Sequence, residues 1–216
     1  MHLKNNKLSS LLIIYLGVFI LWAGYRFFFK NTVFLEETLI KGIVFSLPLF
    51  ILPLSVKNKL NFLGITGENF FKSVYLGIIL GLVLGLAGQV GNLVRHHTML
   101  FSSNNLTAAN IGAFLILSLI TAFWEQLLFS GYFLSFATRL FKSEVVQVTL
   151  TGLLFSLIHL PALLLVNKIT FSQIYLSLLL LLTLGISCSI LRLRQKNLIA
   201  PIMAHALWGV TIFMFR

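Results

Sequence analysis

The sequence predicts an all-α protein, a polytopic bundle of about seven transmembrane helices. Charged residues make up 10% of the 216 residues and apolar residues 58%, whereas about 25% of the residues of an ordinary soluble domain are charged. The mean hydropathy is +0.99. Several apolar runs reach about 18 residues or more, the length at which a helix crosses a bilayer. These observations exclude a soluble globular protein, and we expect residues 1–216 to form a single integral membrane domain.

Each expected span reaches about 20 residues, or about 30 Å of helix. The first apolar run, from Leu11 to Phe29, follows Lys4 and Lys7. It is longer than a signal-peptide core and lacks a convincing small-x-small cleavage site, so we expect it to stay attached as the first span. Short, mostly basic connections separate the later runs. The expected spans lie near residues 8–28, 38–56, 72–93, 110–137, 145–166, 170–190 and 198–215.

The charge is strongly unbalanced, with 16 Lys and Arg against five acidic residues and a net charge of +11. The cations lie mainly in the short gaps between apolar runs, where they set topology and contact anionic lipid head groups. We therefore expect membrane lipid, and not nucleic acid, as the partner of this charge. Most of the cations lie at the amino terminus and after the second, fourth and sixth spans, which predicts a cytoplasmic amino terminus.

Neither the cysteine content nor the one pair of adjacent histidines indicates a metal site. Cys188 is the one cysteine, so neither an internal disulfide nor a cysteine-based metal site can form. It lies within an apolar run, and we expect it to be a small packed residue. His96 and His97 are adjacent in a polar segment, where such a pair is usually solvated.

Three glycines in the third expected span share one helical face. Gly77, Gly81 and Gly85 recur every four residues, which lets a neighbouring helix approach closely. Packing within the bundle is the expectation, because a polytopic protein has many internal faces to fill. Dimerisation through the same face is the alternative.

Three ionisable residues stand out in the middle of expected spans, where an ionisable side chain is costly and indicates a function. They are Glu125, His159 and His205. At 1.5 Å per residue, Glu125 lies about 21 Å from Arg139, His159 about 22 Å from Glu144 and His205 about 13 Å from Lys196. Helix tilt can absorb the difference in depth, so the three can meet. Each is alone on its helix, so a site has to be assembled between helices. The structural alternative is a lone side chain hydrogen-bonded to a neighbouring helix.

The sequences around these residues resemble the CAAX protease and bacteriocin-processing (CPBP, or Abi) family of intramembrane glutamic endopeptidases. Its motifs, in order, are Glu-Glu-x-x-x-Arg, Phe-x-x-x-His and His-x-x-x-Asn. The first corresponds here to residues 125–130, the second is complete from Phe155 to His159, and the third retains His205. The resemblance covers a catalytic core of about residues 110–215, with a looser likeness over residues 60–91.

The chain departs from the family at three motif positions: Gln126 replaces the second Glu, Ser130 the Arg, and Gly209 the Asn. Positions 126 and 130 are i and i+4 on a helix, so the family's Glu and Arg can pair there, and losing both leaves no unpaired charge. We expect Gln126 and Ser130 to hydrogen-bond instead. Gly209 removes an oxyanion donor, a loss that typically lowers the rate about 10²–10³-fold.

The resemblance implies a hydrolase that cleaves peptide bonds in or near a membrane, without a metal or another cofactor. Glu125 would be the general base, His159 its partner and His205 the stabiliser of the transition state. A peptide or lipidated protein would be the substrate, such as a prenylated protein or a bacteriocin or pheromone precursor, and a bacterial plasma membrane the location.

Three alternatives remain open at this point. The three departures favour a weakly active or inactive family member that acts as a bacteriocin immunity protein or binds a membrane partner. A transporter that relays protons through Glu and His is weakened by the lack of a visible inverted repeat. A zinc peptidase is weakened because no His-Glu-x-x-His helix is present.

Overall fold

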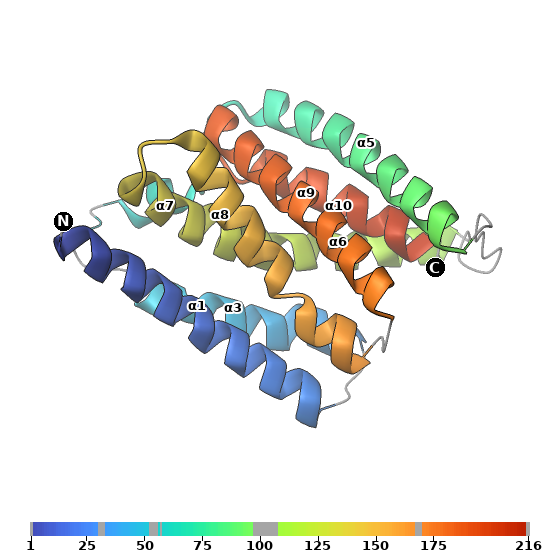
Figure 1. The fold of residues 1–216 in the computed structure, drawn as a ribbon. Helices are drawn as coiled ribbons and strands as arrows, with labels where there is room; N and C mark the ends of the chain where they lie inside the picture. The colour runs from blue at the N-terminus through green and yellow to red at the C-terminus, as the bar shows by residue number, and fades with distance from the viewer. Residues whose placement is uncertain are drawn as a thin grey trace.

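A computed structural model describes residues 2–29, 33–51, 56, 58–96, 108–166 and 170–214. Over these ranges the regular secondary structure is helical, without strands (Figure 1), which confirms the predicted fold class. The elements are α1 (His2–Phe28), α2 (Val33–Leu35), η1 (Glu36–Ile40), α3 (Lys41–Phe50), α4 (Lys59–Leu63), α5 (Phe70–His96), α6 (Ala108–Gln126), η3 (Leu127–Phe133), α7 (Leu134–Leu140), α8 (Glu144–Leu157), η4 (Ala162–Val166), α9 (Phe171–Gln195) and α10 (Ile199–Met214). The three η elements are π-helical.

Five helical stretches in the described part of the chain are long and apolar enough to cross a membrane. They agree with five expected spans and run over Leu8–Phe28, Phe70–Gly91, Asn110–Leu140, Glu144–Leu165 and Phe171–Gln195. A shorter apolar helix, Ile199–Thr211, corresponds to the last expected span. The chain is therefore an integral membrane protein.

The second expected span is the one whose structure differs most from the expectation. Residues 38–56 were expected to form one apolar helix, but helix begins earlier, at Val33, and passes through the π-helical segment η1 before α3 ends at Phe50. The early turns contain buried Glu36 and buried Lys41. Because these two polar side chains are buried, the face of the segment that carries them is directed toward the interior of the bundle.

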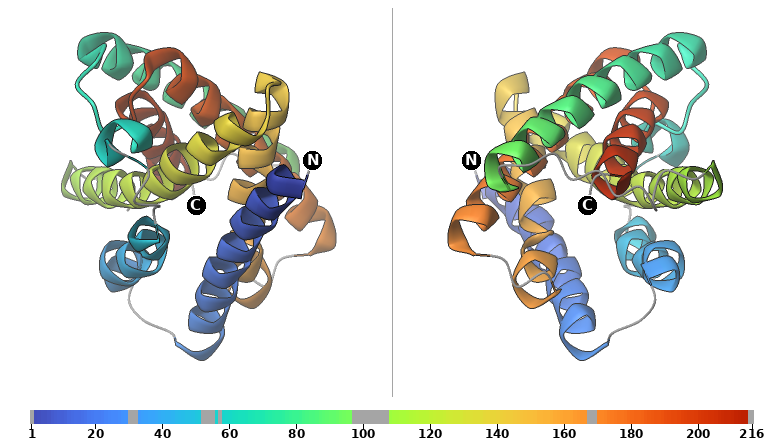
Figure 2. Two further views of the ribbon diagram at one scale, coloured as in Figure 1. Left: turned by 90° about the vertical axis from the view of Figure 1, so that its left-hand side faces the viewer. Right: turned by 90° about the vertical axis from the view of Figure 1, so that its right-hand side faces the viewer.

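The helices form layers in which α6 and α7 lie between two outer groups (Figures 1 and 2). On one side, α10 packs along α5 and also against α6, and α8 packs against α9. On the other side lie α1 and α3, which contact each other. The middle helix can therefore present side chains to elements from both ends of the chain.

The glycine face of α5 packs against α10, as predicted for packing within the bundle. A Cβ added at Gly77 would lie 2.6 Å from the carbonyl oxygen of Ala200, and one at Gly81 2.8 Å from that of Ala204. At Gly85 the nearest atom would be Thr211 Cγ2, at 2.7 Å. Since real Cβ atoms do not approach so closely, the backbones of α5 and α10 sit together only because these residues are glycines.

We expect Gly81→Ala to destabilise the protein by about 1–3 kcal/mol, the usual cost of forcing a group into a packed interior. The added methyl group meets backbone that cannot rotate away, so α10 has to shift. Gly17→Ala is the matched control, because a Cβ at Gly17 meets nothing within 4 Å and alanine favours helix. Thermal unfolding in detergent measures both, and equal stability of the two variants contradicts the packing argument.

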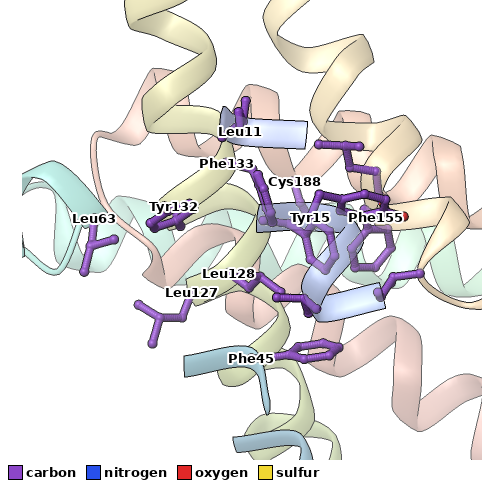
Figure 3. Close-up of a cluster of buried hydrophobic side chains, with 14 of the residues drawn as sticks. Leu11, Tyr15, Phe45, Leu63, Leu127, Leu128, Tyr132, Phe133, Phe155 and Cys188 are labelled. Carbon is purple, nitrogen blue, oxygen red and sulfur yellow. The ribbon is translucent and has the colours of Figure 1, made fainter. Parts of the chain in front are cut away.

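A cluster of aromatic side chains ties the amino-terminal helix to the rest of the bundle (Figure 3). Tyr15 of α1 packs edge-on against Phe133, with 5.8 Å between ring centroids. Its hydroxyl donates to the carbonyl oxygen of Leu154 at 3.1 Å, and this bond links α1 to α8. Cys188 lies in the same cluster, fully buried, and its thiol contacts the Pro201 carbonyl at 3.6 Å. The cysteine is therefore a packed residue, as predicted.

Candidate active site

Glu125 lies in the last turn of α6, immediately before the π-helical segment η3. Its side chain is 3% exposed, and all seven residues of η3 are buried. A π-helical segment widens the helix by one residue and is frequent at functional sites. At Gly131 in this segment an added Cβ would lie 3.1 Å from the carbonyl oxygen of Leu63. The irregular turn and the close packing hold the helix, and so the carboxylate, in one position.

The structure brings Glu125, His159 and His205 together. Glu125 Oε2 lies 3.5 Å from His159 Nε2 and 3.7 Å from His205 Nε2. The carboxylate belongs to α6 and His205 to α10, while His159 lies in the turn after α8. All three line a cavity of about 170 Å³, which Gly209 also lines. Phe155 packs against both imidazoles, with ring centroids 5.0 and 5.5 Å away.

The hydrogen bonds on the far side of each imidazole assign its tautomer. His159 Nδ1 lies 2.8 Å from the Phe155 carbonyl, which can only accept, so Nδ1 carries the proton and Nε2 of the neutral ring is an acceptor. His205 Nδ1 lies 3.1 Å from Gln126 Nε2, which can only donate. Nε2 of His205 therefore carries the proton. In their neutral forms the two histidines therefore face Glu125 with opposite roles, His159 as acceptor and His205 as donor.

Gln126 and Ser130 form the hydrogen bond that the sequence predicts. Ser130 Oγ donates to Gln126 Oε1 at 2.5 Å, and both side chains are buried. This bond orients the Gln126 amide so that its NH₂ group points at His205. The two replaced motif residues thus form a neutral chain that fixes an imidazole of the site.

We expect Gln126→Glu alone, or Ser130→Arg alone, to destabilise the fold more than the two together. Either single change leaves an uncompensated charge in a buried position, which costs about 3–5 kcal/mol, while the pair can form an i, i+4 ion pair. Thermal unfolding of the three variants in detergent checks this. A double variant as unstable as the summed single variants would refute it.

Lys41 is a site residue that the sequence reasoning missed. It is buried, and its Nζ lies 2.7 Å from Glu125 Oε1. It also pairs with Glu37, which accepts a further hydrogen bond from Thr121 Oγ1 at 2.9 Å. The available signal was Lys41 itself, which lies within the expected span 38–56 four residues after Glu37, because an intramembrane cation calls for a partner.

Arg26 extends these charges into a largely buried cluster, which consists of Arg26, Glu36, Glu37, Lys41 and Glu125. Arg26 pairs with Glu36 and lies 3.6 Å from Glu37 Oε1. Its guanidinium also lies over the Trp22 ring, at 4.8 Å from the centroid. This cluster connects the cavity of the candidate site to α1 and η1, neither of which the sequence linked to that site.

Within the described part of the chain no group of three or more His, Cys, Asp or Glu side chains has the arrangement of a metal site. The orientation of His205 is also unsuited to one. A metal-bound histidine normally donates its second ring N–H, whereas His205 Nδ1 receives a hydrogen bond from Gln126. The sequence also predicts that His96 and His97 are solvated. His97 and the side chain of His96 lie outside the described part of the structure, so this prediction is not tested.

The fold and the site define an integral membrane protein with a buried Glu–His–His centre between its helices. The family model described as type II CAAX prenyl endopeptidase Rce1-like matches residues 107–211, which include all three of these residues. No curated protein and no solved structure matches the chain. Residues 107–211 are thus similar to the Rce1-like, CAAX-type intramembrane proteases of the CPBP family.

Proposed function

We propose that this protein is an intramembrane endopeptidase in which Glu125 and His159 activate a water molecule and His205 stabilises the transition state. One observation carries the proposal. Glu125 Oε2 is buried and accepts no hydrogen bond from the described residues, although His159 Nε2 lies 3.5 Å away. Two proton acceptors thus face each other at the edge of a cavity.

A water molecule satisfies both acceptors, because it can donate one hydrogen to Glu125 Oε2 and the other to His159 Nε2. Its lone pairs are then free to attack a peptide carbonyl carbon, while a proton passes to the acceptors as the C–O bond forms. The same proton later passes to the leaving amine as the C–N bond breaks. Lys41, bound to the other carboxylate oxygen, compensates the charge of Glu125 throughout.

His205 supports the developing oxyanion in this scheme. Its Nε2 carries the proton and points toward the same carboxylate oxygen at 3.7 Å. The hydrogen-bond chain through Gln126 orients the ring before the substrate arrives, so the donor requires little reorganisation during the reaction. His159 and His205 therefore take different parts, as their tautomers require.

Exposure of the site favours a substrate that arrives from the lipid side. The side chain of His159 is 23% exposed, against 3% for Glu125 and 5% for His205. The chain around His159 carries the exposed apolar side chains of Leu157, Leu164 and Leu165. A peptide tethered in the membrane, such as a prenylated CAAX-type protein or a bacteriocin or pheromone precursor, fits this entrance. We propose the bacterial plasma membrane as its location.

Cleavage of a labelled precursor panel by purified protein in detergent tests the proposal. The panel contains a farnesylated CAAX peptide and unmodified precursor peptides. We expect cleavage by the wild type, loss of cleavage in Glu125→Ala, and no effect of a chelator. Sensitivity to the chelator would indicate a zinc peptidase instead.

A second candidate is an inactive or weakly active member that protects a cell from a bacteriocin by binding a membrane partner. The ammonium group of Lys41, 2.7 Å from Glu125, favours it, because that contact is also what a purely structural carboxylate would make. If neither wild type nor Glu125→Ala cleaves any precursor while both are folded, this candidate replaces the first.

A further inference from the structure

Ser118 carries a buried hydroxyl that has no hydrogen-bond partner among the described residues. The residue is 3% exposed, and its Oγ is without a partner. A buried hydroxyl without a partner costs free energy, about 1–3 kcal/mol, so such a group calls for an explanation. Other buried serine hydroxyls among the described residues have a partner, as Ser189 Oγ has in the Gly185 carbonyl of its own helix and Ser156 Oγ in the Leu178 carbonyl of α9, both at 2.8 Å. Ser118 differs from them because its hydroxyl remains available to donate a hydrogen bond to a ligand.

The hydroxyl of Ser118 belongs to the active-site cavity. Ser118 lines that cavity together with Glu125 and His205. It lies about two helical turns before Glu125, so the two side chains project from the same face of α6, about 10 Å apart along the axis. A water bound at the carboxylate and the carbonyl group that it attacks fit within this interval, with the carbonyl oxygen directed toward Ser118.

Gly209 opens the space in which Ser118 can act. A Cβ added at Gly209 would lie 3.0 Å from Ser118 Oγ and 3.4 Å from Ser118 Cβ. Any side chain at position 209 would therefore crowd the hydroxyl. Gly209 lies one turn after His205 on α10, which aligns the two positions on one face of the helix. The absence of a side chain at Gly209 thus leaves room for the Ser118 hydroxyl, which occupies the space that a side chain at position 209 would fill.

We propose that Ser118 is a catalytic residue of this peptidase, its hydroxyl donating a hydrogen bond to the tetrahedral oxyanion beside the N–H of His205. The inference rests on the proposed function and extends it to a second donor, at a position of α6 that lies outside the three motifs. It accounts for Gly209, because the donor comes from α6 instead of from α10.

The test compares Ser118→Ala with wild type in the cleavage of the farnesylated CAAX peptide and of the other precursors of the panel. We expect kcat to fall about 10²–10³-fold, as for the loss of one oxyanion donor, with KM little changed. Ser189→Ala is the matched control, since it also removes a buried serine hydroxyl, one that is bonded to its own helix on α9. We expect the control to cleave at the wild-type rate.

A rescue experiment separates a catalytic role from a structural one. In the Ser118→Ala background, Gly209→Asn supplies a new donor where the hydroxyl has been removed, and we expect at least a tenfold recovery of kcat. In the wild-type background the same asparagine meets Ser118 Oγ, and we expect no gain. Recovery limited to the Ser118→Ala background supports the inference.

Two results overturn the inference, and they are distinguishable. If wild-type cleavage depends on Glu125 but Ser118→Ala cleaves as fast as wild type, Ser118 is not a donor and the proposed function stands. If no cleavage depends on Glu125, the proposed function fails and the role of Ser118 fails with it.

Discussion

Replacing Glu125 and His159 together is expected to slow cleavage no more than replacing Glu125 alone. In the proposed mechanism both side chains act on one water molecule, which bridges Glu125 Oε2 and His159 Nε2, 3.5 Å apart. Removal of a general base typically lowers kcat about 10²–10⁴-fold. Residues that act as a unit have grossly non-additive effects, because the first loss already abolishes the shared step. We therefore expect Glu125→Gln, His159→Ala and the double variant to have similar residual kcat/KM values.

The comparison requires variants that are equally well folded, since Glu125 also balances Lys41. Thermal unfolding in detergent is measured for each variant, and Glu125→Gln is used because it keeps the size of the side chain. Phe155→Leu serves as a control that changes packing beside both imidazoles without removing a proton acceptor. If the double variant is slower by the product of the two single effects, His159 and Glu125 act on different steps and the shared-water mechanism is wrong.

The fold class followed from composition because long apolar runs with few charges have one stable form in a bilayer, the helix. The positions of Glu125, His159 and His205 were equally visible, because ionisable residues are rare inside such runs. Their tautomers were not visible. They depend on Gln126 and on the Phe155 carbonyl, and hydropathy carries no information about which ring nitrogen a neighbour faces.

The contribution of the amino-terminal segment was missed for a different physical reason. Lys41 and Glu125 are separated by 84 positions, and their contact arises from the packing of α3 against α6. Periodicity along one helix identifies the inner face of that helix, but it does not identify the helix that will cover it. Ser118 escaped attention similarly, because a serine inside a span commonly bonds to its own helix and only the three-dimensional structure shows that this one does not.

A large loss of stability is expected from Lys41→Met. The change removes the ammonium group from between Glu125 and Glu37 and leaves the carboxylate of Glu125 buried without its cation. Breaking a buried ion pair from one side typically costs about 3–5 kcal/mol, mostly as the penalty of the charge left behind. Lys72→Met is the matched control, because Lys72 is exposed and its ammonium group can remain hydrated. Thermal unfolding in detergent should separate the two variants clearly.

A double-mutant cycle identifies the cause of this loss. Combining Lys41→Met with Glu125→Gln removes both charges, and neutral replacements of a buried ion pair are often tolerated. We therefore expect the double variant to be more stable than Lys41→Met alone, although we expect Glu125→Gln to slow its cleavage of peptides. Arg26 lies 3.6 Å from Glu37 Oε1 and is unchanged in the double variant, so the charge of Glu37 retains a partner. If the two losses instead add, the coupling energy is absent, and the destabilisation comes from lost packing of the lysine stem and not from the unpaired carboxylate.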